Sequence, residues 1–124
     1  MDRDGARAWL ERYVEAWKSY EEKAIAELFS EDAEYRYHPY DEEPDRGRDA
    51  IVAGWLEDRD RPNTYEGSYE PIAVDGDTVV ATGTSTYLDS DGSVDRIYRN
   101  CFVMRFDDSG QCREFTEWYM KHPE

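Results

Sequence analysis

The first segment of the chain carries a stripe of apolar side chains with the spacing of one helical face. Between Asp4 and Lys18 apolar residues recur at helical intervals, and charged residues occupy the opposite side. The stripe consists of Trp9, Leu10, Tyr13, Val14 and Trp17. It predicts a helix with one face on a core. Ser19 and Glu22 then form a capping-box pattern, which predicts that a second short helix begins there and folds back as a hairpin.

The second helix leads into a strand through a short acidic segment. Ile25, Leu28 and Phe29 share one helical face, and residues 30–32 have the composition of a tight turn. Tyrosines then alternate with other residues at positions 35 and 37, which predicts a strand over 33–38.

A polar loop and a third helix follow. The loop YDEEPDRG, residues 40–47, is interrupted by proline and glycine and is predicted to lie on the surface. The helix, predicted over 48–59 and ended by Pro62, buries four apolar residues. These are Ile51, Val52, Trp55 and Leu56.

From Tyr65 onward the pattern changes from helical to extended. Three dipeptides typical of hairpin turns, Asp75-Gly76, Asp91-Gly92 and Ser109-Gly110, divide the remaining chain. The predicted strands cover 65–74, 78–88, 94–106 and 112–121, in an antiparallel meander. Helices followed by strands indicate an α+β fold, with a strongly bent sheet that wraps around the first helix as a cone with one open end.

Composition limits the range of functions. With 124 residues, of which 39% are hydrophobic, the chain is expected to form one domain, 1–124, with a real core. The net charge of -15 disfavours binding to nucleic acid or to anionic membranes. No apolar run approaches the roughly 20 residues of a membrane helix. Cys101 and Cys112, without a signal-type segment, lead us to expect reduced thiols in a cytoplasmic protein.

The order of features between residues 24 and 51 resembles a known superfamily. A Leu28-Phe29 pair is followed by the acidic turn, Ala33 at the strand start, Pro39 at its end, and the run 47–51, GRDAI. This succession resembles the first-strand entry of nuclear transport factor 2, ketosteroid isomerase and the SnoaL-like polyketide cyclases. The resemblance implies their cone-shaped fold, with a pocket at the open end.

Strand parity indicates which side chains face that pocket, because neighbouring residues point to opposite faces. The polar groups expected to converge there are Tyr13, Tyr35, Tyr37, Asn100 and Glu117. The side chains expected to contact a small, apolar or amphipathic ligand are Trp17, Tyr37, Trp55, Tyr98, Asn100, Phe102, Phe115 and Tyr119. Trp118 and Met120 have the opposite parity, which predicts a homodimer formed through the outer face.

Glu117 is the main candidate for chemistry. A carboxylate among aromatic rings has a raised pKa and can exchange protons near neutrality. Alternatively, Glu117 pairs with Arg96 or Arg113 and only closes the sheet. Tyr13 resembles the helix tyrosine that donates to the oxyanion in ketosteroid isomerases, or it is a core tyrosine whose hydroxyl reaches a backbone carbonyl.

Other family sites match only in part. The ketosteroid isomerase base falls at Tyr37 or His38, and its second oxyanion acid falls at Phe102, which argues against steroid isomerisation. Tyr35 and Glu117 match positions in limonene epoxide hydrolases. However, Gly83 and Ser85 replace the arginine and aspartate of that site.

Two hypotheses exist for His38. It transfers a proton at the pocket, or it forms a hydrogen bond with a carboxylate of the acidic loop that follows it. Spaced metal-ligand pairs and a phosphate-binding glycine loop are missing from the sequence, so neither a metal nor another cofactor is predicted. The turn at 89–92 looks like part of a calcium loop but is explained as a hairpin turn.

These observations leave three functional hypotheses. The first is an enzyme of isomerase, cyclase, dehydratase or hydrolase type, in which Glu117 or His38 transfers a proton while Tyr13, Tyr35 or Asn100 holds an oxygen atom of the substrate. The second is a ligand-binding module without catalysis. The third is a dimeric interaction domain whose own side chains fill the cone.

Overall fold

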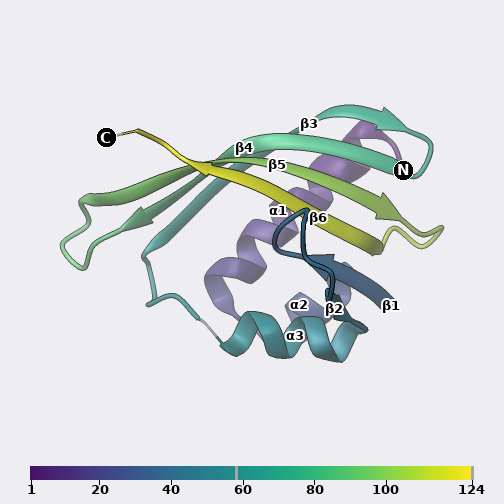
Figure 1. The fold of residues 1–124 in the computed structure, drawn as a ribbon, viewed down its shortest axis with the longest axis horizontal. Coiled ribbons are helices and arrows are strands. Elements are labelled where there is room, and N and C mark those ends of the chain that lie inside the picture. The colour runs from purple at the N-terminus through teal and green to yellow at the C-terminus, as the bar shows by residue number, and fades with distance from the viewer. Residues whose placement is uncertain (58, 124) are drawn as a thin grey trace.

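A curved six-stranded sheet and three helices make up the computed structural model, which describes residues 1–57 and 59–123 (Figure 1). The strand order across the sheet is β2-β1-β6-β5-β4-β3. The helices are α1 (Arg3–Ser19), α2 (Glu22–Leu28) and α3 (Arg48–Glu57). The strands are β1 (Phe29–Arg36), β2 (Asp45–Arg46), β3 (Tyr65–Asp75), β4 (Thr78–Leu88), β5 (Val94–Phe106) and β6 (Cys112–Lys121). The class predicted from the sequence is confirmed.

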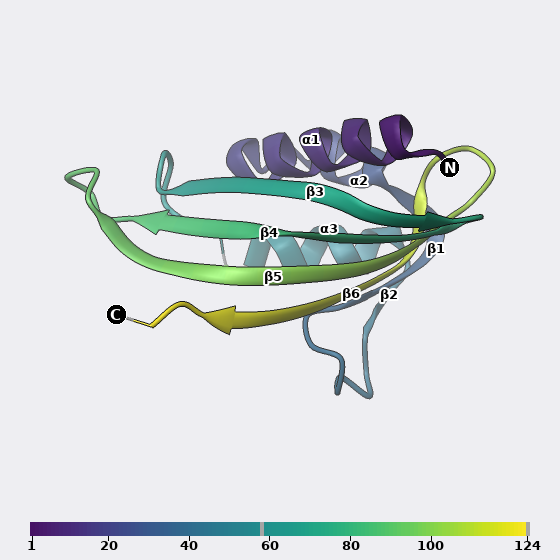
Figure 2. The same cartoon turned by 90° about the horizontal axis from the view of Figure 1, so that it is seen from above.

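The four long strands form the predicted meander, and their pairing is antiparallel from β3 to β6. Strand β1 pairs with β6 in parallel, which the sequence pattern did not indicate. A parallel pair between the first and the last long strand requires a long connection, and the whole meander supplies it. The sheet bends over α1, which runs along one side of it (Figure 2).

Helix α1 begins and ends as local chemistry dictates. The Asp2 side chain accepts a hydrogen bond from the Gly5 amide at 2.7 Å and caps the first turn. Tyr20, in the left-handed conformation with φ of 52°, closes the last turn. The predicted capping box is wrong: α2 has no side-chain cap, and the Ser19 hydroxyl instead accepts from the Glu21 amide. Tyr20, in the left-handed conformation, ends α1 and turns the chain toward α2 without a side-chain cap from Ser19.

Strand β1 begins earlier than predicted. Phe29 is its first residue, and residues 30–32, predicted as a turn, belong to the strand. The register with β6 shifts between Phe29 and Glu34, which is the signature of a bulge. A bulge can accommodate residues typical of a turn, so the strand continues through them. The loop 40–47 also holds the short strand β2, which pairs with Glu34 and Tyr35 of β1.

Aromatic rings fill most of the cone. The prediction that α1 packs on the concave side is confirmed, because Trp9 and Tyr13 are buried against the sheet. Trp9 contacts Phe106 and Phe115, and Tyr13 stacks on Phe115 with ring centroids 5.5 Å apart. Trp17 at the end of α1 stacks on Trp55 of α3 at 4.2 Å. The open space is therefore confined to the end of the cone.

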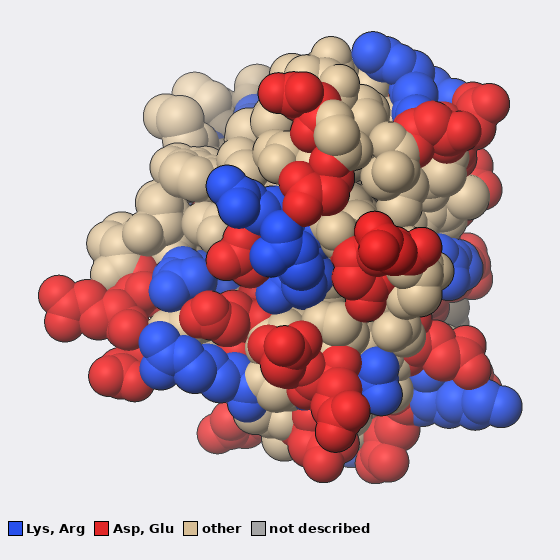
Figure 3. Space-filling model, turned by 90° about the vertical axis from the view of Figure 1, so that its right-hand side faces the viewer, with Lys and Arg blue, Asp and Glu red and all other residues tan. Residues whose placement is uncertain are grey.

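Acidic and basic side chains are interspersed among uncharged ones on the face of the molecule that Figure 3 shows. No helix within residues 1–57 and 59–123 is both long and apolar enough to cross a membrane.

Two buried tryptophans give a matched test of the core. Trp9 Nε1 donates to the Leu28 carbonyl at 3.0 Å, whereas Trp55 Nε1 has no partner among the described residues. We expect Trp9→Phe to lower the free energy of unfolding by about 3 kcal/mol, since it leaves a cavity and an unsatisfied carbonyl. Trp55→Phe removes an unsatisfied donor and should cost about 1 to 2 kcal/mol. Urea unfolding measures both, and a larger loss for Trp55→Phe would contradict the assignment.

Candidate functional site

A pocket of about 260 Å³ opens at the end of the cone where α1 ends and the β4–β5 hairpin turns. We call it the mouth pocket. Its walls come from α1, from the segment after α3, and from β4, β5 and β6. The residues that line it are Trp17, Asp60, Ser85, Tyr87, Arg96, Tyr98, Asn100, Glu117 and Tyr119. Aromatic rings thus form much of the wall, and polar groups lie between them.

Glu117 reaches this pocket as parity predicted. It lies opposite Phe102 on β5, and its neighbour Tyr119 lies opposite Asn100. The Asn100 side-chain amide donates to Glu117 Oε2 at 2.6 Å. This bond fixes one oxygen of the carboxylate and leaves the other for a ligand.

The surroundings of Glu117 favour its protonated form. Burial raises the pKa of Glu117 to about 7, although the hydrogen bond from Asn100 lowers it in part. Neither candidate arginine relieves this effect, because Arg96 pairs with Asp95 at 2.6 Å and Arg113 pairs with Asp77 at 2.7 Å. The alternative that Glu117 forms an ion pair with either arginine is therefore wrong. Arg96 lies over the Tyr87 ring instead, 4.3 Å from its centroid.

A chain of hydrogen bonds supports Asn100 from behind. Its side-chain carbonyl accepts from the Ser85 hydroxyl at 3.0 Å, and Ser85 contacts the Tyr69 hydroxyl at 2.5 Å. Tyr69 in turn contacts the Tyr65 hydroxyl at 2.7 Å. Because Ser85 gives its only proton to Asn100, Tyr69 must donate to Ser85 and Tyr65 to Tyr69. The chain therefore ends in an amide N–H directed at Glu117.

Tyr13 and Tyr35 lie beneath the pocket, in the core. Their hydroxyls are 3.2 Å apart and share a hydrogen bond, so Tyr13 does not reach a backbone carbonyl as the alternative reading had it. Both are almost fully buried, and burial raises the pKa of each hydroxyl, with further contributions that include the Glu117 charge. They form a floor of neutral hydroxyls and rings.

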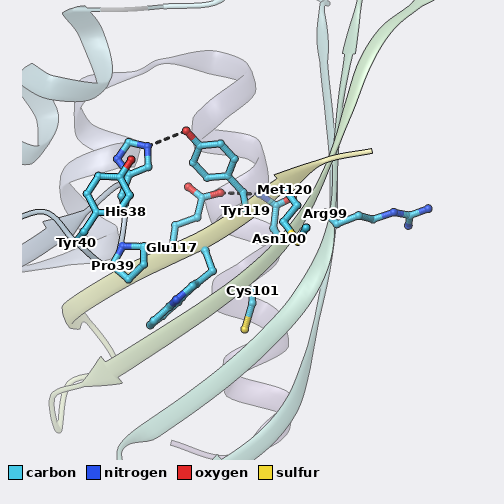
Figure 4. A pocket seen from close by; sticks show the side chains of 10 residues that line it. His38, Pro39, Tyr40, Arg99, Asn100, Cys101, Glu117, Tyr119 and Met120 are labelled. Carbon is cyan, nitrogen blue, oxygen red and sulfur yellow. Dashed lines mark hydrogen bonds between the residues drawn. The ribbon is translucent and has the colours of Figure 1, made fainter. Parts of the chain in front are cut away.

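His38 lies at the edge of β6, beside a second pocket of about 530 Å³ (Figure 4). We call this the edge pocket. Asn100, Glu117 and Tyr119 line both pockets, so the two meet at these side chains. His38 Nε2 lies 2.8 Å from the Tyr119 hydroxyl, and its Nδ1 lies 3.3 Å from Asp41 Oδ1. The predicted bond to a loop carboxylate is present.

Apart from His38, the predicted site residues fall into two groups in the structure. Lining the mouth pocket are Trp17, Tyr98, Asn100, Glu117 and Tyr119. Packed in or against the core are Tyr13, Tyr35, Tyr37, Trp55, Phe102 and Phe115. Tyr37 lies beyond the end of β1, with its ring against Tyr35. For the core group, ligand contact would require the packing to open.

Sequence reasoning missed several lining residues. Ser85, Tyr87 and Arg96 have the inward parity and could have been named from it. Asp60 could not, because its place depends on a contact: the Tyr20 hydroxyl donates to Asp60 Oδ2 at 3.0 Å and accepts from the Asp60 amide. Gly83, where the hydrolase comparison expected a charged side chain, has no room for one, since a Cβ would collide with the Ser68 carbonyl oxygen.

Metal ligation has no support in residues 1–57 and 59–123, where no three His, Cys, Asp or Glu side chains converge. At the mouth, Asn100 and Ser85 are engaged in hydrogen bonds, and the second oxygen of Glu117 faces the pocket. The arrangement is suited to proton transfer and to hydrogen bonding of a small polar group.

Comparison with solved structures supports the fold. An NTF-2 like protein of unknown function from Burkholderia xenovorans LB400 is similar with a TM-score of 0.72 and 18% identity, covering 98% of this chain and 87% of the other. A putative ketosteroid isomerase from Kribbella flavida DSM 17836 gives a TM-score of 0.71 and 19% identity, with coverage of 99% and 83%. At these identities the likeness concerns the fold alone.

The sequence itself defines the family. The model of the SnoaL-like domain matches residues 10–115, which is most of the chain. The protein therefore belongs to the SnoaL-like domain family, as the resemblance of its first-strand entry indicated. No curated protein sequence matches it significantly.

The raised pKa of Glu117 predicts a pH-dependent effect on stability. The folded-state pKa of about 7 exceeds the ordinary value of 4.5, so the contribution of Glu117 to stability is present at low pH and is lost as the pH rises to 7. We expect Glu117→Gln to raise the free energy of unfolding at pH 8 by about 2 kcal/mol relative to its effect at pH 5.

Urea unfolding at the two pH values measures this difference. Glu114→Gln, on the same strand but paired with Arg105 at the surface, serves as the control and should show no such gain. A loss of stability at pH 8 in Glu117→Gln would mean that the carboxylate has a favourable partner.

Proposed function

We propose that this domain binds a small amphipathic molecule in the mouth pocket and that Glu117 transfers a proton to or from it. The observation that carries the proposal is the carboxylate of Glu117, held by Asn100 in an aromatic pocket with a pKa of about 7. A group with that pKa is half ionised at neutral pH and can act as base or acid.

The geometry favours some reactions over others. The pocket accommodates a ligand of one or two rings, whose apolar faces would meet Trp17, Tyr98 and Tyr119. Removal of a proton beside a carbonyl suits isomerase, cyclase or dehydratase chemistry. Epoxide hydrolysis of the limonene type is disfavoured, because Gly83 and Ser85 supply neither the arginine nor the aspartate of that site. Steroid isomerisation is disfavoured by the buried Phe102 at the second acid position.

A ligand-binding module without catalysis is the alternative. The dense aromatic core favours it, since little open space remains below Glu117. In that case the carboxylate and Asn100 would only hydrogen-bond a hydroxyl or amine of the ligand.

Exchange of carbon-bound protons separates the two. With 1-tetralone as probe, we expect the protein in D₂O to accelerate hydrogen–deuterium exchange beside the carbonyl, and Glu117→Gln to lower the rate at least about 100-fold. Affinity for the probe, followed by NMR shifts of Trp17 and Tyr98, should change little. Binding without exchange in the unmodified protein would support the module, and equal exchange in both proteins would exclude Glu117.

We also propose that the protein dimerises through the outer face of β4, β5 and β6. Trp118 and Met120 are 43% and 75% exposed there. Their strand neighbours extend the apolar area, since Cys101 lies opposite Trp118 and Val80 lies opposite Val103. A stable contact would bury on the order of 1,600 Å² in total.

The free thiols of Cys101 and Cys112 suit the cytoplasm, where we expect the protein to reside.

Trp118→Glu tests the dimer. We expect sedimentation at tens of micromolar to show a dimer for the unmodified protein and a monomer for this variant, because a charge would be buried in the contact. Ile72→Glu, which changes an exposed apolar residue of β3, should remain dimeric. An unmodified protein that sediments as a monomer would refute the proposal.

A further inference from the structure

A second group able to move a proton stands beside Glu117, at the free edge of β6. Strand β1 pairs with β6 only as far as Thr116, so the end of β6 lies next to the turn that follows β1. There Asp41 and His38 of the turn and Tyr119 of β6 line up as carboxylate, imidazole and hydroxyl, with separations of 3.3 Å and 2.8 Å. Figure 4 shows the bond from His38 to Tyr119, with Glu117 beside it.

The turn holds the imidazole in one orientation. Asp41 Oδ2 accepts from the His38 amide at 3.1 Å, and the Asp41 amide donates to the His38 carbonyl at 3.2 Å. Arg36 Nε donates to the Asp41 carbonyl, and the Tyr40 ring stacks on the imidazole with centroids 4.8 Å apart. A hydroxyl, a base and a group that orients the base are the parts that activate side chains for acid–base chemistry.

Tyr119 is also accessible to a ligand in the mouth pocket. It follows Glu117 by two positions, so both side chains extend from the same face of β6, about 7 Å apart along the strand. Tyr119 lines both pockets. In a bound ketone, the carbonyl oxygen could therefore lie near Tyr119 while the carbon next to the carbonyl lies near Glu117.

We propose that Tyr119 is a catalytic acid, positioned and resupplied by His38 and Asp41, which donates to the ligand oxygen while Glu117 takes a proton from the neighbouring carbon. The inference rests on the function proposed above for Glu117. In the reacting state His38 is protonated on both nitrogens: Nδ1–H donates to Asp41 and Nε2–H donates to the Tyr119 oxygen. The Tyr119 O–H is then free to point at the ligand.

The step balances in protons and electrons. The Glu117 carboxylate accepts the proton of the ligand carbon, and the C–H electron pair becomes a carbon–carbon double bond to the carbonyl carbon. The carbonyl oxygen takes the Tyr119 proton, and Tyr119 takes the Nε2 proton of His38. The products are an enol, a neutral Glu117 carboxyl and a neutral imidazole, and reversal at another carbon completes an isomerisation.

The charges around Tyr119 suit a donor. Burial, followed by the charge of Glu117, raises the pKa of Tyr119, so the hydroxyl is favoured over a phenolate nucleophile. The titratable and charged groups that face it or line its two pockets are Tyr40, Asp41 and His38 after β1, Asp60 after α3, Tyr87 on β4, Arg96, Tyr98, Arg99 and Cys101 on β5, and Glu117 on β6.

Carbonyl-labelled ¹³C 1-tetralone tests the donor directly. We expect the bound carbonyl resonance at pH 6 to lie downfield in the unmodified protein and to lose that shift in Tyr119→Phe. The exchange rate beside the carbonyl should fall about 10-fold or more, with little change in affinity. Glu114→Gln, a surface change on the same strand at a residue that lines neither pocket, should behave as the unmodified protein does.

The pH profile gives a readout that a structural role would not change. The rate should rise with pH near 7 as Glu117 ionises. Tyr119→Phe should keep this rising limb while the rate falls at every pH, as the loss of a donor and not a change in Glu117 would produce. In the free protein, Asp41→Asn should shift the ¹⁵N resonance of His38 Nδ1, because that nitrogen loses its hydrogen-bond partner.

The outcomes separate this inference from the function it rests on. If Glu117→Gln abolishes exchange while Tyr119→Phe changes neither the rate nor the carbonyl shift, the acid assignment is overturned and the role of Glu117 stands. If the unmodified protein shows no exchange but its carbonyl shift depends on Tyr119, proton transfer fails and the donor assignment is upheld. A ¹⁵N spectrum of the His38 ring that is the same in Asp41→Asn, Tyr119→Phe and the unmodified protein would overturn the triad without any ligand.

Discussion

The packing of aromatic rings between α1 and the sheet is the constraint on which the rest of the structure depends. Trp9 and Tyr13 fill the narrow part of the cone against Phe106, Phe115 and their neighbours. A core of this density leaves no room for a deep polar site. The chemistry is therefore confined to the rim, where the strands diverge and polar side chains can meet both the core and water.

This boundary position explains the properties of Glu117. Rings below it remove water and disfavour its charge, while Asn100 supplies one donor and keeps the charged form accessible. The supporting chain through Ser85 runs across three neighbouring strands. Such a chain holds a side chain more firmly than a single bond would, because each member is fixed by the next.

Part of this site could be predicted from the sequence. Glu117 and Asn100 follow from strand parity and from the length of the hairpins, because each turn sets the register of the strands that it joins. Asp60 could not be predicted, since its position depends on the hydroxyl of Tyr20 at the end of α1. Whether Arg96 or Arg113 pairs with Glu117 could not be predicted either. Parity gives the face of the sheet on which a side chain lies, but not the side chain that it contacts.

Local periodicity and turn chemistry were enough to predict the order of helices and strands, the buried face of α1, the three hairpin turns and the shared faces of β5 and β6. The bulge in β1, the parallel pairing of β1 with β6, and the contact of His38 with Tyr119, 81 residues away, could not be predicted in this way. They arise from contacts between segments that are distant in the chain. The pairing of β1 with β6 brings the turn after β1 beside Tyr119.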